Sequence, residues 1–157
     1  MTFLKSLALA ASFALALSCS AAADDGVRIA AAFALTSGKI GGTAAVYLEI
    51  ENHHNDADLL LSATSDAARK VTIHRSAESA DGVMSMAETA LPIPALGFLA
   101  LQPGQNHVML MGLTRTLAVG DVITLTLTFE RAGAVTIEVP VTDAAPAAGH
   151  ENHPTTP

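Results

Sequence analysis

Apolar and polar residues alternate in short runs along most of the chain, and a period of two is typical of β-strands. Within 44–51, for example, Val46, Leu48 and Ile50 fall on one face while the residues between them fall on the other. No window after residue 24 keeps a convincing helical period over about ten residues. The pattern and its turn signals predict strands at 27–35, 44–51, 59–63, 70–74, 83–88, 97–101, 107–113, 121–131 and 134–141.

About eight or nine short strands predict an antiparallel β-sandwich or small barrel with Greek-key connections. The Leu91-Pro92-Ile93-Pro94 segment is expected to be a connector. It cannot be a central strand, because its two prolines lack the amide donor that a sheet ladder requires. Residues 24–142 form one β domain in this interpretation, and 143–157, rich in Ala, Pro and Thr, are predicted to be a disordered tail.

The first residues are typical of a secretory signal peptide, which we place at 1–23. Lys5 supplies the positive start, an Ala-, Leu- and Phe-rich run follows, and Ala21-Ala22-Ala23 forms a small-residue cleavage site. We therefore expect export to the periplasm with cleavage near Ala23. Cys19 is an alternative site of lipoprotein acylation. Cleavage after Ala23 would remove Cys19, the one cysteine of the chain, and leave no thiolate for catalysis or metal binding.

The charge balance excludes one class of partner. The chain has 8 basic and 15 acidic residues and a formal net charge of -7. Nucleic-acid binding depends largely on a basic surface, so we expect none. Aromatic residues make up only 4% of the chain, and a core built from Ala, Leu, Val and Ile is therefore expected.

The candidate chemistry lies between His74 and Met111. Every Met except the initiator falls in this window, together with His74 and His107. Imidazole and thioether are neutral donors, and thioethers in particular suit monovalent copper. Strand alternation places His107, Met109 and Met111 on one face, and Met84 and Met86 together on another strand. We interpret the window as a copper site.

The same window resembles the periplasmic copper chaperone family PCu(A)C. That family carries a His, about ten residues, a Met, about twenty-one residues, and then His-x-Met. Here eleven residues separate His74 from Met86, and twenty separate Met86 from His107. Met84 as the ligand would leave nine and twenty-two, so the choice between the two Met stays open, with Met86 preferred as the second Met of Val-Met-x-Met. The strand at 44–52 and the segment 101–113 are also similar, and the resemblance covers roughly 44–141.

The resemblance implies a cupredoxin-like fold and a non-enzymatic carrier that binds Cu(I) through His74, Met86, His107 and Met109. Its implied partner is the copper-binding subunit of cytochrome c oxidase or another copper chaperone. Met84 and Met111 are further candidates for the main site. His150 and His153 in the tail are candidates for Cu(II), whereas His53-His54 is interpreted as a surface turn. We expect a monomer that reaches a membrane only through its partner, unless Cys19 is lipidated.

The sequence disfavours two other functions and leaves two open. A blue-copper electron carrier needs a cysteine thiolate, which the cleaved chain would lack. A secreted hydrolase is disfavoured, because neither a nucleophile elbow nor a His-Glu-x-x-His zinc motif is present. A copper-tolerance protein that sequesters the metal without delivering it remains an alternative. A plain adhesive domain remains another, and it would bind no copper.

Overall fold

The computed structural model describes residues 26–78 and 84–144, with the backbone alone at 76–78 and 84–87. Ten strands and no helix occur within this part of the chain, which confirms the all-β prediction. The strands are β1 (Val27–Thr36), β2 (Thr43–Asn52), β3 (Asp58–Ser65), β4 (Ala68–Glu78), β5 (Met84–Glu88), β6 (Leu91–Ile93), β7 (Phe98–Leu101), β8 (His107–Leu113), β9 (Val122–Phe129) and β10 (Ala134–Thr142).

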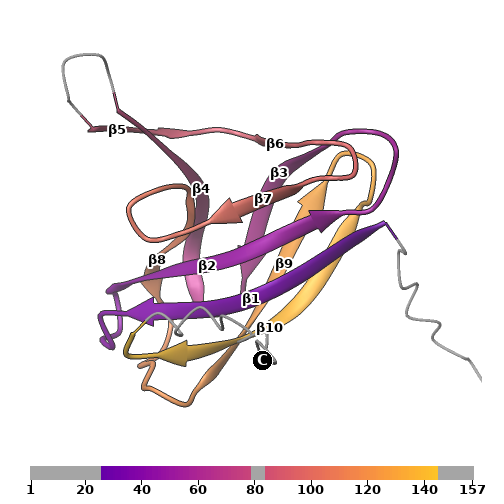
Figure 1. The fold of residues 1–157 in the computed structure, drawn as a ribbon. Helices are drawn as coiled ribbons and strands as arrows, with labels where there is room; N and C mark the ends of the chain where they lie inside the picture. Colours follow the sequence, from indigo (N-terminus) through magenta and orange to yellow (C-terminus); the bar gives the residue numbers. More distant parts are fainter. Residues whose placement is uncertain (1–25, 79–83, 145–157) are drawn as a thin grey trace, which may run out of the picture.

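One sheet wraps around the core in the order β5-β4-β8-β2-β1-β10-β9-β3-β6, with β7 also paired to β2 (Figure 1). All neighbours are antiparallel except β1 and β10, which run parallel. The sheet therefore forms a nearly closed, barrel-like sandwich. In Figure 1 the end of β4 and β5 project beyond its body.

The predicted alternation determines which side chains form the core. Val46, Leu48 and Ile50 of β2 are buried, as are Leu125 and Leu127 of β9. The intervening residues face outward and are half-buried or exposed. Burying an aliphatic side chain of this size contributes roughly 1.5–3 kcal/mol, so this alternation fixes the register of each strand.

Two strands differ from the sequence-based expectation. Leu91–Ile93 was expected to be a connector, but it forms the three-residue strand β6, which pairs with β3 at the end of the sheet. This edge position agrees with the expectation that the segment is not a central strand. At the edge of the sheet, the missing amide of Pro92 interrupts no hydrogen-bond ladder between inner strands. Strand β4 also continues four residues past His74, because β5 pairs with that extension.

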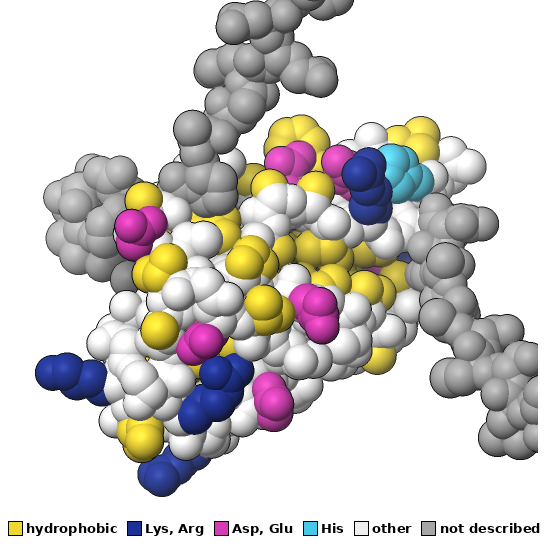
Figure 2. Space-filling view, turned by 90° about the horizontal axis from the view of Figure 1, so that it is seen from below, with side chains coloured by type: hydrophobic (Ala, Val, Ile, Leu, Met, Phe, Trp, Pro, Cys, Tyr) yellow, Lys and Arg dark blue, Asp and Glu magenta, His cyan; other side chains and the backbone are white. Residues whose placement is uncertain are grey.

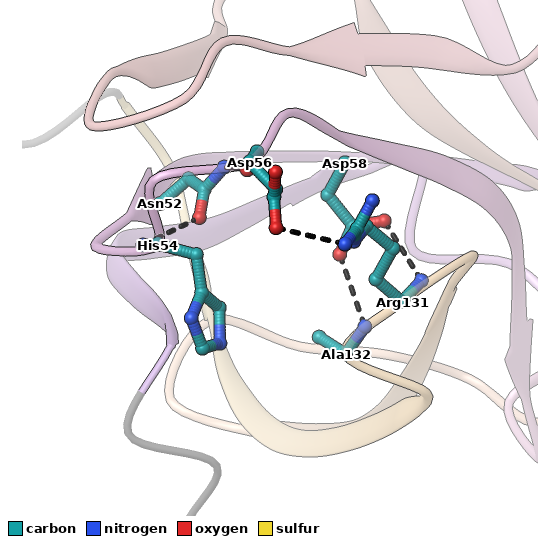
Figure 3. Close-up of polar contacts among 6 residues, drawn as sticks. All are labelled: Asn52, His54, Asp56, Asp58, Arg131 and Ala132. Atoms are coloured by element: carbon teal, nitrogen blue, oxygen red, sulfur yellow. Dashed lines mark hydrogen bonds and ion pairs between the residues drawn. The ribbon is translucent and has the colours of Figure 1, made fainter.

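A buried carboxylate holds the turn that connects β2 to β3. Asp58 is 4% exposed and accepts hydrogen bonds from the backbone N–H groups of Leu59, Arg131 and Ala132, at 2.7, 2.9 and 3.0 Å. The Arg131 side chain pairs with Asp56 at 2.8 Å (Figure 3). Burial alone would raise the pKa of Asp58, but the three hydrogen bonds and the charge of Arg131 outweigh it and lower that pKa.

The surface carries both signs of charge. On the face shown in Figure 2, acidic and basic side chains are interspersed, with hydrophobic side chains between them. No helix among the described residues is long and apolar enough to span a bilayer.

Candidate metal centre

The structure brings the two predicted histidines together. His74 of β4 and His107 of β8 are direct partners across the two strands. Their ring centres lie 5.2 Å apart, and the rings meet edge to face at 78°. A metal-bound imidazole nitrogen lies about 2 Å from its ion, so rings this close are within reach of one ion.

The strand register explains why the rings of His74 and His107 lie close together. Phe33 of β1 is paired with Tyr47 of β2, whose ring lies beside that of His107. The ring centres are 5.2 Å apart for Phe33 and Tyr47 and 6.1 Å apart for Tyr47 and His107. Four rings therefore cross four neighbouring strands in one row, which ends at His74. Because rings flank it on both sides, His107 is only 7% exposed, although its face of the sheet is the outer one.

The predicted thioethers of β8 follow His107 on the same face. Met109 is paired with Thr72 of β4 on one side and with Ala45 of β2 on the other. Met111 is paired with Lys70 and Thr43. Both Met are half-buried, whereas Val108 and Leu110 between them are fully buried. The alternation predicted for this strand is therefore confirmed.

His107 is fixed by a backbone acceptor. Its Nδ1 lies 3.0 Å from the carbonyl oxygen of Gln105. A carbonyl oxygen only accepts, so Nδ1 of His107 carries a proton and donates it. In the neutral ring the lone pair is then on Nε2. A metal-binding imidazole is typically held by such a bond from its other nitrogen.

His74 has one satisfied and one unsatisfied nitrogen. Its Nε2 lies 2.9 Å from the Thr72 hydroxyl oxygen. Its Nδ1 is buried and has no hydrogen-bond partner. Leaving a buried polar atom unpaired costs about 1–3 kcal/mol, which a ligand at that atom would recover. Burial, and then the neighbouring His107, lower the pKa of His74 below its ordinary value, so the ring is neutral at pH 7.

The Met of β5 are placed by backbone pairing alone. Met86 lies opposite Ser76, two residues beyond His74 along β4. Met84 lies opposite Glu78, a further two residues away. In register, Met86 is therefore the nearer of the two to the histidine pair.

Four further histidines were considered in the sequence. His150 and His153 lie outside the described residues. His53 and His54 are exposed in the turn after β2, as expected, and His53 Nε2 lies 3.2 Å from a carboxylate oxygen of Glu51. Among residues 26–78 and 84–144, no three His, Cys, Asp or Glu side chains gather closely enough to hold a metal ion.

Three groups around the histidines were missed in the sequence. Thr72 lies two residues before His74, so alternation alone would have placed its hydroxyl on the same face. The ring of Tyr47 and the carbonyl of Gln105 needed the strand register and the turn before β8. Neither has a local sequence signal.

The solved structures to which this chain is similar include PCuAC domains. It is 26% identical to the copper-bound PCuAC domain from PmoF2, with a TM-score of 0.62 over 76% of this chain and 94% of that one. It is 26% identical to CuI-DR1885 from Deinococcus radiodurans, with a TM-score of 0.57 over 78% and 83% of the two chains. The apo PCuAC domain from PmoF1, 23% identical with a TM-score of 0.65 over 76% and 95%, supports the fold. This chain therefore has the cupredoxin-like fold of the PCuAC domains to which it is similar.

Residues 26–141 match the family described as "Putative lipoprotein LpqE-like", and the chain belongs to that family. The chain is also 32% identical over 120 residues to "Putative lipoprotein Lxx21020" of Leifsonia xyli subsp. xyli, a match that covers 76% of this chain and 71% of the relative. The resemblance to copper chaperone domains predicted from the His and Met pattern is therefore confirmed at the level of family and fold.

Proposed function

We propose that this protein is an exported copper carrier that binds one Cu(I) ion through His74, Met86, His107 and Met109. The observation that carries the proposal is the cross-strand histidine pair, whose rings lie 5.2 Å apart. One nitrogen of that pair, Nδ1 of His74, is buried without a partner. A soft cation between the rings would satisfy it.

The hydrogen bonds around the pair leave one free nitrogen on each ring. Nδ1 of His107 donates to the carbonyl of Gln105, which leaves Nε2 as the donor to copper. If Nε2 of His74 donates to the Thr72 hydroxyl, the Nδ1 lone pair is the second donor. His74 would thus bind through Nδ1 and His107 through Nε2. Because the pKa of His74 is lowered, its ring would enter the site neutral, and copper would displace no proton from it at neutral pH.

Thioethers complete the proposed site. Met109 follows His107 on the same outer face, and Met86 lies two register positions beyond His74. Neutral sulfur and nitrogen donors favour the soft monovalent ion over Zn(II) or Mg(II). They also bind more weakly than thiolates, which suits a carrier that releases its cargo. Met84 is the alternative to Met86, and Met111 is a further thioether on the β8 face.

The proposal also includes delivery of the bound copper to another protein. The relatives include a copper-bound PCuAC domain and a CuI form of DR1885, and we extend copper carriage to this chain on that basis. The acceptor we propose is the copper centre of cytochrome c oxidase, reached in the periplasm after removal of the signal peptide. The tail residues His150 and His153 would add a Cu(II) site. The protein has no catalytic role in this proposal.

Sequestration without delivery is the alternative function, and a transfer assay separates the two. The Cu(I)-loaded protein is mixed with the apo copper-binding domain of the oxidase from the same source, and the copper content of each is measured after separation. Delivery predicts that the oxidase domain gains the copper that the carrier loses. Retention of Cu(I) by the carrier in the presence of excess acceptor would favour sequestration.

A further inference from the structure

Two large apolar side chains, separated in sequence only by Gly97, are exposed to solvent. Leu96 is 68% exposed and Phe98 is 63% exposed. Both line a surface hollow of about 310 Å³, whose other walls include Glu49, Glu51 and His53. A single exposed apolar residue needs no explanation, but two that share one hollow form a candidate binding surface.

The backbone presents Leu96 at a conformational cost. Its φ is +49°, in the left-handed region that favours Gly or Asn over Leu. Hydrogen bonds hold this conformation, from Leu96 N–H to the His54 carbonyl at 2.9 Å and from Asn52 N–H to the Gly97 carbonyl at 2.8 Å. The chain thus keeps a solvent-exposed leucine where a smaller polar residue would be less strained. Strain of this kind is typical of recognition sites.

Buried Asn52 links this loop to the rest of the fold. It is 2% exposed, and its side-chain amide donates to the carbonyls of Asp56 and Pro94 at 2.9 and 3.0 Å. Its side-chain oxygen accepts from the His54 backbone N–H (Figure 3). The loop that carries Leu96 is therefore fixed to the turn that Asp58 anchors, and a partner would meet a preformed surface.

The hollow lies on the same face of the sheet as the histidine pair. Phe98 is paired with Glu51, which shares the outer face of β2 with Tyr47. Glu51 and Tyr47 are four residues apart, which is about 13 Å along a strand. A standard protein interface of about 800 Å² on each side is about 28 Å across. A protein that approaches His107 would therefore cover the hollow as well.

The walls of the hollow indicate what enters it. Glu49 and Glu51 line the hollow together with Phe98, and Glu51 is the cross-strand partner of Phe98. A Lys or Arg side chain fits this combination, with its charged head at the carboxylates and its stem against apolar surface. Arg28 lies 3.6 Å from Glu51, but the Arg28 side chain is 71% exposed, and exchanging such an ion pair for another costs little free energy. The net charge of -7 also favours a basic partner.

We propose that the docking surface formed by Leu96, Phe98, Glu49 and Glu51 binds the protein that receives the copper. The matching surface of that protein is apolar and carries a projecting Lys or Arg. This inference rests on the proposed function, because it takes the copper acceptor as the occupant.

The test compares copper transfer with copper binding in the full mature chain. The probe is the apo copper-binding domain of the oxidase from the same source. The variant Leu96→Asn/Phe98→Thr removes the apolar contacts but keeps residues suited to a positive φ and to a strand. The matched control is Val119→Asn/Val122→Thr, which replaces two apolar residues, 63% and 48% exposed, in and near β9. We expect the docking variant to transfer copper at least about tenfold more slowly with unchanged Cu(I) affinity, and the control to match wild type.

The salt dependence of copper transfer tests the role of the two carboxylates, Glu49 and Glu51. Wild-type transfer should slow between about 0.02 and 0.3 M NaCl, because salt screens the carboxylates from the basic partner. Glu49→Gln/Glu51→Gln should be slower at low salt and less sensitive to salt, whereas Glu130→Gln/Glu138→Gln should behave as wild type.

The outcomes separate this inference from the proposed function. Equal transfer rates for wild type and the docking variant would overturn the docking surface and leave copper carriage intact. If wild type binds Cu(I) but passes none to the oxidase domain, delivery and the docking assignment both fail. If wild type binds no Cu(I), the proposed function itself is wrong.

Discussion

His74 and His107 are 33 positions apart in the chain, yet they face each other directly across β4 and β8. The pairing places the two rings edge to face on the outer side of the sheet. On the core side, Ile73 and Val108 form the neighbouring cross-strand pair and are buried. The same register that buries the aliphatic residues therefore assembles the histidines, and a slip by one residue would destroy both.

The Thr72 hydroxyl is expected to orient His74 for copper. Thr72→Val keeps the shape of the side chain but removes the 2.9 Å contact to Nε2. Loss of a partner of this kind typically weakens metal binding about tenfold or more. Competition with a Cu(I) chelator measures the affinity, and ¹⁵N NMR of the imidazole reports which nitrogen of His74 carries the proton.

Thr72→Ser is the matched control for that experiment. It restores the hydroxyl and should restore both the wild-type affinity and the Nε2–H form of His74. If Thr72→Val binds Cu(I) as tightly as wild type and the tautomer is unchanged, the hydroxyl does not position the ring.

The stability of the apo protein should depend on pH through His74. The pKa of His74 is lowered in the folded state by burial and by His107. As pH falls below about 6.5, the unfolded chain binds a proton at this residue that the folded chain does not yet bind. This contribution to the free energy of unfolding is thus intact above pH 6.5 and is lost as pH falls toward the lowered value.

Urea unfolding with a metal chelator present, at a series of pH values from about 7.5 to 5, measures this effect. His74→Gln lacks the titrating group, so wild type should lose more stability than this variant as pH falls. A constant difference between the two proteins across the series would show that His74 does not contribute.

Asp58 should be needed for stability, whereas its neighbour Asp56 should not. Asp58→Ala leaves the partly buried N–H groups of Arg131 and Ala132 without their acceptor. With about 1–3 kcal/mol for each unsatisfied group, we expect a loss of about 3 kcal/mol by urea unfolding. Asp56→Ala removes an exposed ion pair and should cost less than about 1 kcal/mol. Equal losses would contradict the anchoring role of Asp58.

Met86 rather than Met84 should hold copper. Met86→Leu keeps the size of the side chain and removes the sulfur, and we expect it to weaken Cu(I) binding about tenfold, or about 1.4 kcal/mol. Met84→Leu, two residues earlier on the same strand, is the internal control and should bind as wild type. A reversal of the two results would move the ligand to Met84 and would fit the spacing of nine and twenty-two residues.

Much of this architecture could be predicted because the apolar alternation is strong. The inward residues of β2 and β9 are read directly from the period of two, and so is the shared face of His107 and Met109. The strand β6 was missed because Pro92 within it and Pro94 just after it are typical of a connector. Its edge pairing with β3 is a long-range contact that no local pattern reveals. The left-handed Leu96 was missed for a similar reason, since distant groups of Asn52 and His54 hold it.

The candidate centre was only partly predictable. The spacing and the resemblance identified both histidines as candidate ligands, but they did not predict how the two rings are arranged. Their ring geometry depends on the register of β4 against β8, and the proton positions depend on Thr72 and on a carbonyl in the turn before β8. Such partners come from tertiary structure, so sequence reasoning found the donors to copper without the groups that orient them.

A titration with Cu(I) against a competing chelator tests whether the histidine pair and its neighbouring Met bind copper. Wild type and His107→Ala/Met109→Ala are compared side by side. Circular dichroism of the double variant checks that the β fold is retained. We expect one tightly bound Cu(I) per wild-type chain and loss of that site in the folded double variant. Unchanged stoichiometry and affinity in the variant would contradict the assignment of the histidine pair and its neighbouring Met as the copper site.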